Sequence, residues 1–261
     1  MSFKKIKNFI LDTLFPIHCL YCQKYGAWIC KECLEKINIL PIQVCPYCEK
    51  NISPAGRICP LCKDKFLRKN ETWPLDALIV SAKYEKNGIS RLVHCFKYNF
   101  VSDLGAPLAE IVSKAIIFHN LPLPDFIIPI PLHYRRLRWR GFNQGEILAN
   151  NLSEILTPSF PLSVISNFLI RKKYTPAQMK IKNYSERKKN VRDIFGLNPN
   201  VETQNIASQN FASLQNKNIL LVDDICTTGA TLFEAGKILK SAGAKKVFGA
   251  VIARQEIKVK K

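Results

Sequence analysis

The sequence predicts an α/β protein whose central, mostly parallel sheet is flanked by helices and follows a small cysteine-rich head. From residue 75 to residue 253, apolar runs typical of strands alternate with helical patterns, which favours a parallel sheet. Eight of the ten cysteines lie in C-x-x-C pairs before residue 63. A chain of 261 residues is long enough for one ordinary domain with such an appendage.

The head, residues 1–70, contains four C-x-x-C pairs, and each pair can bring two sulfurs to one tetrahedral Zn²⁺. We therefore expect two structural zinc sites. The simplest pairing is sequential, because each set then closes a short hairpin; an interleaved pairing is the alternative. In the sequential pairing the ligand sets are Cys19, Cys22, Cys30 and Cys33, and Cys45, Cys48, Cys59 and Cys62. Four thiolates leave no open coordination position, so we expect no catalysis there.

The first residues of the head predict an amphipathic helix over 3–15, with apolar residues on one side and lysines elsewhere. We expect this face to pack on its own domain, and peripheral contact with a membrane is the alternative. The sequence has no apolar run long enough for a membrane span and no pattern typical of a signal peptide, which predicts a cytoplasmic protein. A secreted disulfide framework is therefore the less favoured interpretation of the cysteines.

Residues 63–73 are polar and Pro74 follows them, so a second domain is expected over 75–261. Its predicted elements are a strand over 77–82, helices over 89–98 and 104–119, and a strand over 126–130. A helix beginning near Phe142 follows, and the last elements are a strand over 219–222, a helix over 232–242 and a strand over 247–253. The polar residues 198–218 between them are expected to form a surface excursion.

Residues 219–232, ILLVDDICTTGATL, combine a buried strand, two carboxylates, a Thr-Thr-Gly turn and a helix start. Parallel α/β sheets bind their ligands at the carboxyl ends of strands, and the free N–H groups of a helix start bind anions. The pair Asp223 and Asp224 suits a diol or Mg²⁺. This segment resembles the 5-phosphoribosyl 1-pyrophosphate (PRPP) motif of type I phosphoribosyltransferases. The resemblance implies that Asp223 and Asp224 contact the ribose, and that the phosphate is bound by Thr227, Thr228, Gly229, Ala230 and Thr231.

Residues 130–144, IPLHYRRLRWRGFNQ, place four arginines between a strand end and a helix, where guanidinium groups suit a pyrophosphate. This segment, above all RGFNQ, resembles the ComF family of phosphoribosyltransferase-like proteins, which carry an N-terminal double zinc ribbon. The resemblance implies a type I phosphoribosyltransferase fold in which Arg140, Gly141, Asn143 and Gln144 form the pyrophosphate loop. It also implies that Lys97 reaches the pyrophosphate, and that residues of about 168–197 form a flap over the site. A groove wall that follows a phosphate backbone is the alternative for this basic segment.

The formal net charge of +19 indicates a partner or substrate rich in phosphate. One interpretation is an enzyme that transfers ribose 5-phosphate from Mg²⁺·PRPP to an unidentified acceptor and releases pyrophosphate. The ComF resemblance implies a role in DNA uptake during natural competence. The alternative is therefore a catalytically silent PRPP-fold protein that binds single-stranded DNA and a helicase partner.

Overall fold

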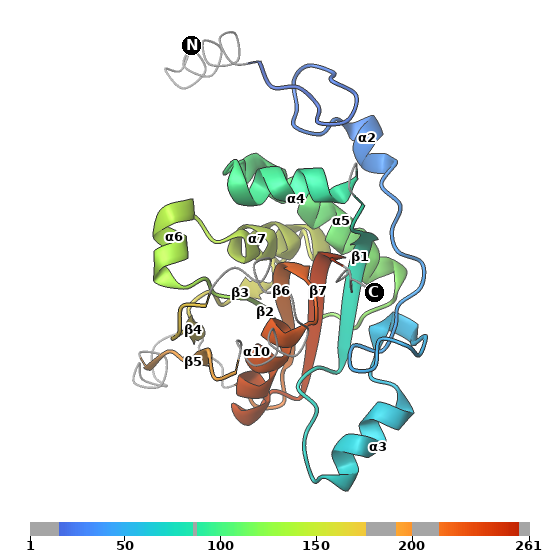
Figure 1. Ribbon diagram of the computed structural model, residues 1–261, viewed down its shortest axis with the longest axis vertical. Helices are drawn as coiled ribbons and strands as arrows, with labels where there is room; N and C mark the ends of the chain where they lie inside the picture. Colours follow the sequence, from blue (N-terminus) through green and yellow to red (C-terminus); the bar gives the residue numbers. More distant parts are fainter. Residues whose placement is uncertain (1–15, 86–87, 176–191, 200–213, 256–261) are drawn as a thin grey trace, which may run out of the picture.

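The computed structural model describes residues 16–85, 88–175, 192–199 and 214–255. A five-stranded parallel sheet forms its centre, with the strands in the order β1-β7-β6-β2-β3 (Figure 1). The strands are β1 (Ala77–Lys83), β2 (Phe126–Pro129), β3 (Ser163–Val164), β6 (Asn218–Cys226) and β7 (Lys246–Arg254). The predicted parallel α/β fold is confirmed.

Helices cover both faces of this sheet because alternate strand residues point to opposite sides. In β6, Leu220 and Val222 pack in the core on one face, and Ile219 and Leu221 pack in the core on the other. The first face is covered by α4 (Ile89–Tyr98), α5 (Gly105–Phe118) and α7 (Gln144–Leu156), with the short turn η2 (Ser102–Leu104) between α4 and α5. The second face is covered by α10 (Ala230–Ser241) (Figure 1).

A second, two-stranded antiparallel sheet pairs β4 (Leu169–Arg171) with β5 (Phe195–Leu197). These strands mark the two ends of the segment for which a flap is predicted. Residues 176–191, which make up its middle, lie outside the described residues, as do most of the polar excursion over 198–218 and the predicted helix over 3–15. The flap itself therefore stays a prediction.

Three elements differ from the sequence-based expectation. The arginine-rich segment is a helix, α6 (Tyr134–Arg140), rather than a loop; it ends at Gly141, whose φ of 77° is left-handed. The polar segment before Pro74 is largely helical, in α3 (Pro60–Arg68). Finally, β6 continues through the acidic pair to Cys226, where its pairing with β7 persists, and α10 begins two residues earlier than expected.

The head lies along β1, the edge strand of the sheet. The Leu40 N–H donates to the Ser81 carbonyl oxygen and the Ile58 N–H donates to that of Asp76, while the Gln43 side chain bonds both the N–H and the carbonyl of Val80. The head contains α2 (Lys31–Glu35), α3 and the turn η1 (Pro54–Gly56). Because its polar groups satisfy those of the edge strand, the head closes an edge that would otherwise be open to pairing with another chain.

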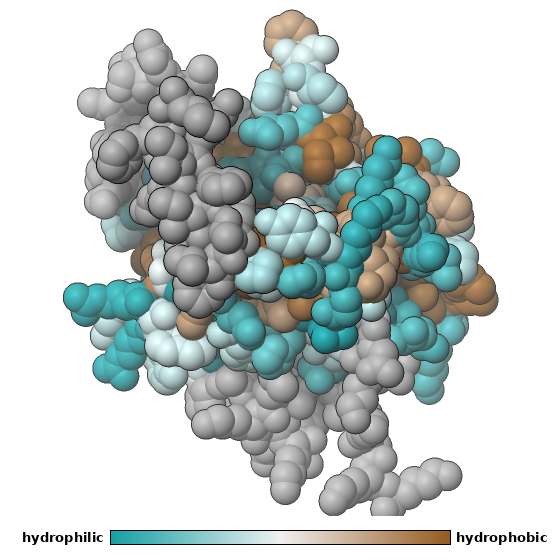
Figure 2. All heavy atoms as spheres, turned by 90° about the horizontal axis from the view of Figure 1, so that it is seen from above, coloured by the Kyte–Doolittle hydropathy of each residue, from teal (hydrophilic) through white to brown (hydrophobic). Residues whose placement is uncertain are grey.

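Within the described ranges, every helix is too short or too polar to cross a membrane. Seen from above, hydrophilic and apolar side chains are intermixed on the face shown in Figure 2. That face shows no continuous apolar surface among its coloured residues.

Candidate functional site

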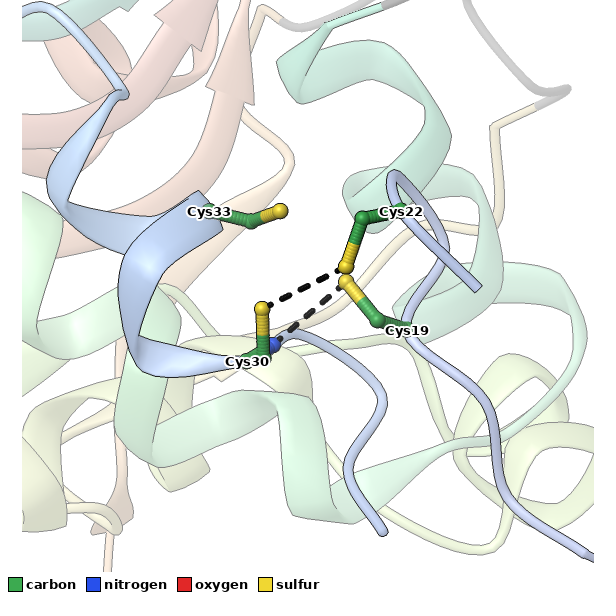
Figure 3. Close-up of side chains that lie close together, drawn as sticks. All are labelled: Cys19, Cys22, Cys30 and Cys33. Carbon is green, nitrogen blue, oxygen red and sulfur yellow. Dashed lines mark hydrogen bonds between the residues drawn. The ribbon is translucent and has the colours of Figure 1, made fainter. Parts of the chain in front are cut away.

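The cysteines of the head form two groups, each with four sulfurs within 4.8 Å of one another. The first group is Cys19, Cys22, Cys30 and Cys33, and the second is Cys45, Cys48, Cys59 and Cys62. In the first group the four side chains converge on one point (Figure 3). The sequential pairing is therefore confirmed as the grouping in space, and the interleaved alternative is wrong.

The donor set of both groups fits zinc. A tetrahedral site with Zn–S bonds of about 2.3 Å places its sulfurs about 3.8 Å apart. The Sγ atoms of Cys22 and Cys30 are 3.5 Å apart, and those of Cys48 and Cys59 are 3.9 Å apart. Backbone N–H groups also point at the sulfurs, from Cys30 to Cys19 and from Cys59 to Cys45, which favours thiolates. None of the ten cysteines, all of which lie in the described ranges, forms a disulfide, so the disulfide interpretation gains no support.

The acidic pair lies at the carboxyl end of β6, in the middle of the sheet. Asp224 is only 6% exposed. Its Oδ1 accepts a hydrogen bond from the Ile225 N–H and lies 2.7 Å from Lys97 Nζ. Asp223 is partly exposed, and its Oδ1 accepts a hydrogen bond from the Asp224 N–H at 2.9 Å. One carboxylate is thus neutralised within the protein, while the other faces the opening of the site.

Burial and the adjacent charge of Asp224 raise the pKa of Asp223 to about 7, although Lys97 and Arg171 act in the opposite direction. A carboxyl group with such a pKa accepts a cation or a pair of hydroxyl donors readily, because either relieves the repulsion between the two acids. Asp223 is therefore the carboxyl group of the pair that a bound cation or diol would affect more.

The turn after β6 has the geometry of an anion-binding loop. Gly229 adopts a left-handed conformation with φ 69°, which a residue with a side chain would adopt only under strain, and it caps α10. The buried Thr228 hydroxyl accepts from the Ala230 N–H at 3.3 Å and so holds the turn. Thr227 and Thr231 line the cavity beside the acidic pair. The N-terminus of α10 adjoins these residues, and helix N-termini favour bound anions.

Three arginines bring positive charge to the other side of the site. Arg136 donates to the Thr175 carbonyl oxygen at 2.7 Å, and Arg171 donates to the Thr175 hydroxyl at 2.8 Å. Arg140 donates to Gln144 Oε1 at 2.9 Å and lies over the ring of Tyr98. The Nε atoms of Arg140 and Arg171 are buried without a hydrogen-bond partner among the described residues. Burial and Arg136 lower the pKa of Arg171 to about 10, so an anion would stabilise this group.

These groups surround one cavity of about 140 Å³. Its polar lining residues are Tyr84, His94, Lys97, Tyr98, Arg136, Arg140, Arg171, Asp223, Asp224, Thr227, Thr231 and Gln255. The cavity has acids on one side, an amide-rich turn beside them and guanidinium groups opposite. It can therefore bind a ligand that carries a diol and anionic groups at both ends.

The sequence-predicted site residues outside the cysteine groups fall into three sets. Lys97, Arg140, Thr227, Thr231 and both acids line the cavity, whereas Thr228, Gly229 and Ala230 shape the turn beside it. The remaining three shape the bend between α6 and α7, where Gly141 ends α6, Asn143 caps α7 and bonds the Ile130 carbonyl, and the buried Gln144 accepts from Arg140. Their contact with a ligand stays a prediction.

Sequence reasoning missed the lining residues Tyr84, His94, Tyr98 and Gln255. It counted Arg136 among the four arginines that suit a pyrophosphate but did not select it as a site residue, and it did not place Arg171 in the site. The α4 residues could have been found, because His94, Lys97 and Tyr98 recur at intervals of three and four residues on one helix face. Arg136 faces the site because α6 is helical, a feature that the segment's polar sequence does not indicate.

Residues 143–261 match the family model of the phosphoribosyl transferase domain. The chain is 28% identical to competence protein F of Haemophilus influenzae over 90% of its own length and 96% of that protein. It is 29% identical to DNA utilization protein YhgH of Salmonella typhi, over 84% of this chain and 87% of that one. Identity to competence protein ComFC of Bacillus subtilis is 25%, over 86% and 82% of the two chains.

The fold, the strand-acid-turn-helix arrangement and the domain match define a protein with a phosphoribosyltransferase-type domain. Together with the relatives and the paired cysteine groups, they support a ComF-family protein with such a domain.

Proposed function

We propose that the cavity at the carboxyl end of β6 binds PRPP together with Mg²⁺. The observation that carries this proposal is the convergence of Asp223 and Asp224, the Thr227–Thr231 turn and the arginines on one cavity. The turn suits the 5′-phosphate, the acids suit the ribose hydroxyls or Mg²⁺, and Arg136, Arg140 and Arg171 suit the pyrophosphate. Lys97 is paired with Asp224 and lines the same cavity as the arginines.

We further propose transfer of ribose 5-phosphate to an acceptor, with release of pyrophosphate. The bond between the anomeric carbon and the pyrophosphate oxygen breaks, its electron pair leaves with the pyrophosphate, and an acceptor atom bonds to the carbon. The arginines would stabilise the negative charge that develops on the leaving group, and the turn would hold the phosphate end in place. Bound Mg²⁺ would supply further charge neutralisation of the pyrophosphate. No residue of the site needs to bond covalently to the substrate.

The biological setting that we propose is DNA uptake in the cytoplasm. The names of the relatives, competence protein and DNA utilization protein, support it, as do the charge of +19 and the free thiols, which suit a reducing compartment. The second candidate is a silent PRPP-fold protein that binds single-stranded DNA beside a helicase. The exposed Arg135 and Arg138 on α6 favour it, because they leave basic charge outside the cavity.

Calorimetric titration with PRPP, with and without Mg²⁺, tests the binding, and release of pyrophosphate with a panel of acceptors tests the transfer. We expect binding that requires Mg²⁺ and is lost in Asp223→Asn with Asp224→Asn. Binding without release for every acceptor would leave only the silent candidate. Absence of binding would overturn both candidates as far as they involve PRPP.

A further inference from the structure

The second cysteine group lies against the turn that follows β6. Tyr47 lies between the ligands Cys45 and Cys48, and Glu49 follows Cys48. The Tyr47 side chain contacts α10, and the Glu49 side chain contacts the end of β7. The sequence separates Glu49 from Thr227 by more than 170 residues. The contacts therefore connect the cysteine-rich head to the candidate phosphate site through the folded structure.

The first connection passes through Arg254, at the end of β7. Its Nη1 lies 3.6 Å from Glu49 Oε1, and its Nε donates to the sulfur of Cys226 at 3.4 Å. The Gln255 N–H also donates to the Cys226 carbonyl oxygen at 2.9 Å. Arg254 is only 16% exposed, so its guanidinium is held between the head and β6. Cys226 directly precedes Thr227, and the start of the turn is fixed by these contacts.

The second connection passes through Phe233, in the first turn of α10. The rings of Tyr47 and Phe233 are stacked, with centroids 4.9 Å apart and an interplanar angle of 22°. The Phe233 N–H donates to the Gly229 carbonyl oxygen at 2.9 Å, within the turn itself. Tyr47 is fixed in turn because its hydroxyl donates to the Leu75 carbonyl and accepts from the Leu75 N–H, both at 2.8 Å.

We infer that Tyr47 and Glu49 are positioning residues for the phosphate turn, and that the second cysteine group sets the affinity of that turn for a sugar phosphate. The inference rests on the proposed function of the cavity. A metal on Cys45, Cys48, Cys59 and Cys62 would fix the backbone on both sides of Tyr47, and thereby the two side chains that hold Cys226 and Phe233. An anion-binding turn must be held in its bound geometry, because any ordering on binding reduces the affinity.

The test is titration of the full-length, zinc-loaded protein with ribose 5-phosphate and, separately, with inorganic pyrophosphate. The variants are Glu49→Gln, which removes the charge opposite Arg254 at equal size, and Tyr47→Leu, which removes the stacked ring. Tyr47→Phe keeps the ring and loses only the bonds to Leu75. Glu110→Gln is the matched control, because it removes an ion pair, to Lys114 on α5, without touching the turn.

We expect ribose 5-phosphate to bind about fivefold or more weakly to Glu49→Gln and Tyr47→Leu, the range of a modest coupling between sites. Pyrophosphate binding should change less than twofold in both. Tyr47→Phe, which keeps the stacked ring but loses the bonds that fix it, should fall between the wild-type protein and Tyr47→Leu for ribose 5-phosphate, and Glu110→Gln should keep wild-type affinity for both ligands. Equal weakening for both ligands would show general destabilisation and overturn the inference, as would wild-type affinity for ribose 5-phosphate in Glu49→Gln. Failure of the wild-type protein to bind both ribose 5-phosphate and Mg²⁺·PRPP would instead overturn the proposed function, and the inference with it. Binding of PRPP without any binding of ribose 5-phosphate would overturn the inference alone.

Discussion

Lys97 Nζ lies 2.7 Å from Asp224 Oδ1, and this ion pair connects the last turn of α4 to the carboxyl end of β6. Both side chains are largely buried, at 19% and 8% exposure. The pair therefore gives one of two adjacent acids a cation inside the protein, while the pKa of the other acid, Asp223, is raised. The two acids of the site consequently respond differently to substitution.

Replacing Lys97 should weaken both the fold and the site. Lys97→Met leaves Asp224 buried without its cation, and we expect a loss of about 2 kcal/mol or more in the free energy of unfolding. Binding of PRPP should weaken by at least about tenfold, since a charge-assisted contact is lost. Thermal unfolding and calorimetry measure the two effects. A variant with wild-type stability would show that the ion pair does not hold Asp224.

Replacing Asp223 should stabilise the protein in the absence of ligand. Because the folded state raises the pKa of Asp223 from 3.8 to about 7, ionisation of this group opposes folding at higher pH. The cost decreases as pH falls below 7 and is gone below the ordinary pKa of 3.8. Asp223→Asn should therefore gain about 1–3 kcal/mol at pH 8 and much less at pH 5. Denaturant unfolding at the two pH values tests this expectation. A gain of the same size at both would contradict the titration of Asp223.

Removal of metal should unfold the head and expose the edge of the sheet. We expect about two zinc ions per chain by elemental analysis, and one in Cys48→Ser, because the two groups are separate in space. Chelation should lower the melting temperature, since metal binding stabilises such small sites. A content of one zinc in the wild-type protein would mean that one group does not bind metal.

The contact of η1 with β1 predicts a site that tolerates only glycine. Gly56 has a φ of 61°, and a Cβ there would collide with the carbonyl oxygen of Leu78. Gly56→Ala should cost about 2 kcal/mol or more in unfolding free energy. Gly141→Ala is the control, because Gly141 has a similar φ of 77° but open space around it. Its cost should be about 1 kcal/mol, from the backbone alone. Equal costs would mean that the head does not pack closely on β1.

The sequence was most informative where the chain's local pattern alone decides the structure. Runs such as Ile219–Val222 are buried on both faces, which identifies strands of a parallel sheet, and C-x-x-C pairs bring sulfurs together by their own spacing. The acidic pair and the turn after it could therefore be located correctly. Local patterns did not place Lys97 in the site; only the family resemblance did.

Features that depend on long-range contacts could not be predicted in this way. The helix α6 is short, and its position beside Thr175, whose carbonyl accepts a hydrogen bond from Arg136, does not follow from its own periodicity. The raised pKa of Asp223 depends on burial contributed by several elements. The connections from Tyr47 to Phe233 and from Glu49 to Arg254 join residues far apart in sequence, and no local pattern indicates them.

A crystal structure with Mg²⁺ and PRPP tests the central claim most directly, namely that the cavity at the end of β6 binds this ligand. We predict the 5′-phosphate at the amides of Thr227–Thr231, the ribose hydroxyls or Mg²⁺ at Asp223 and Asp224, and the pyrophosphate beside Arg140 and Arg171. PRPP bound elsewhere, or absent from the cavity at saturating concentration, would contradict the claim.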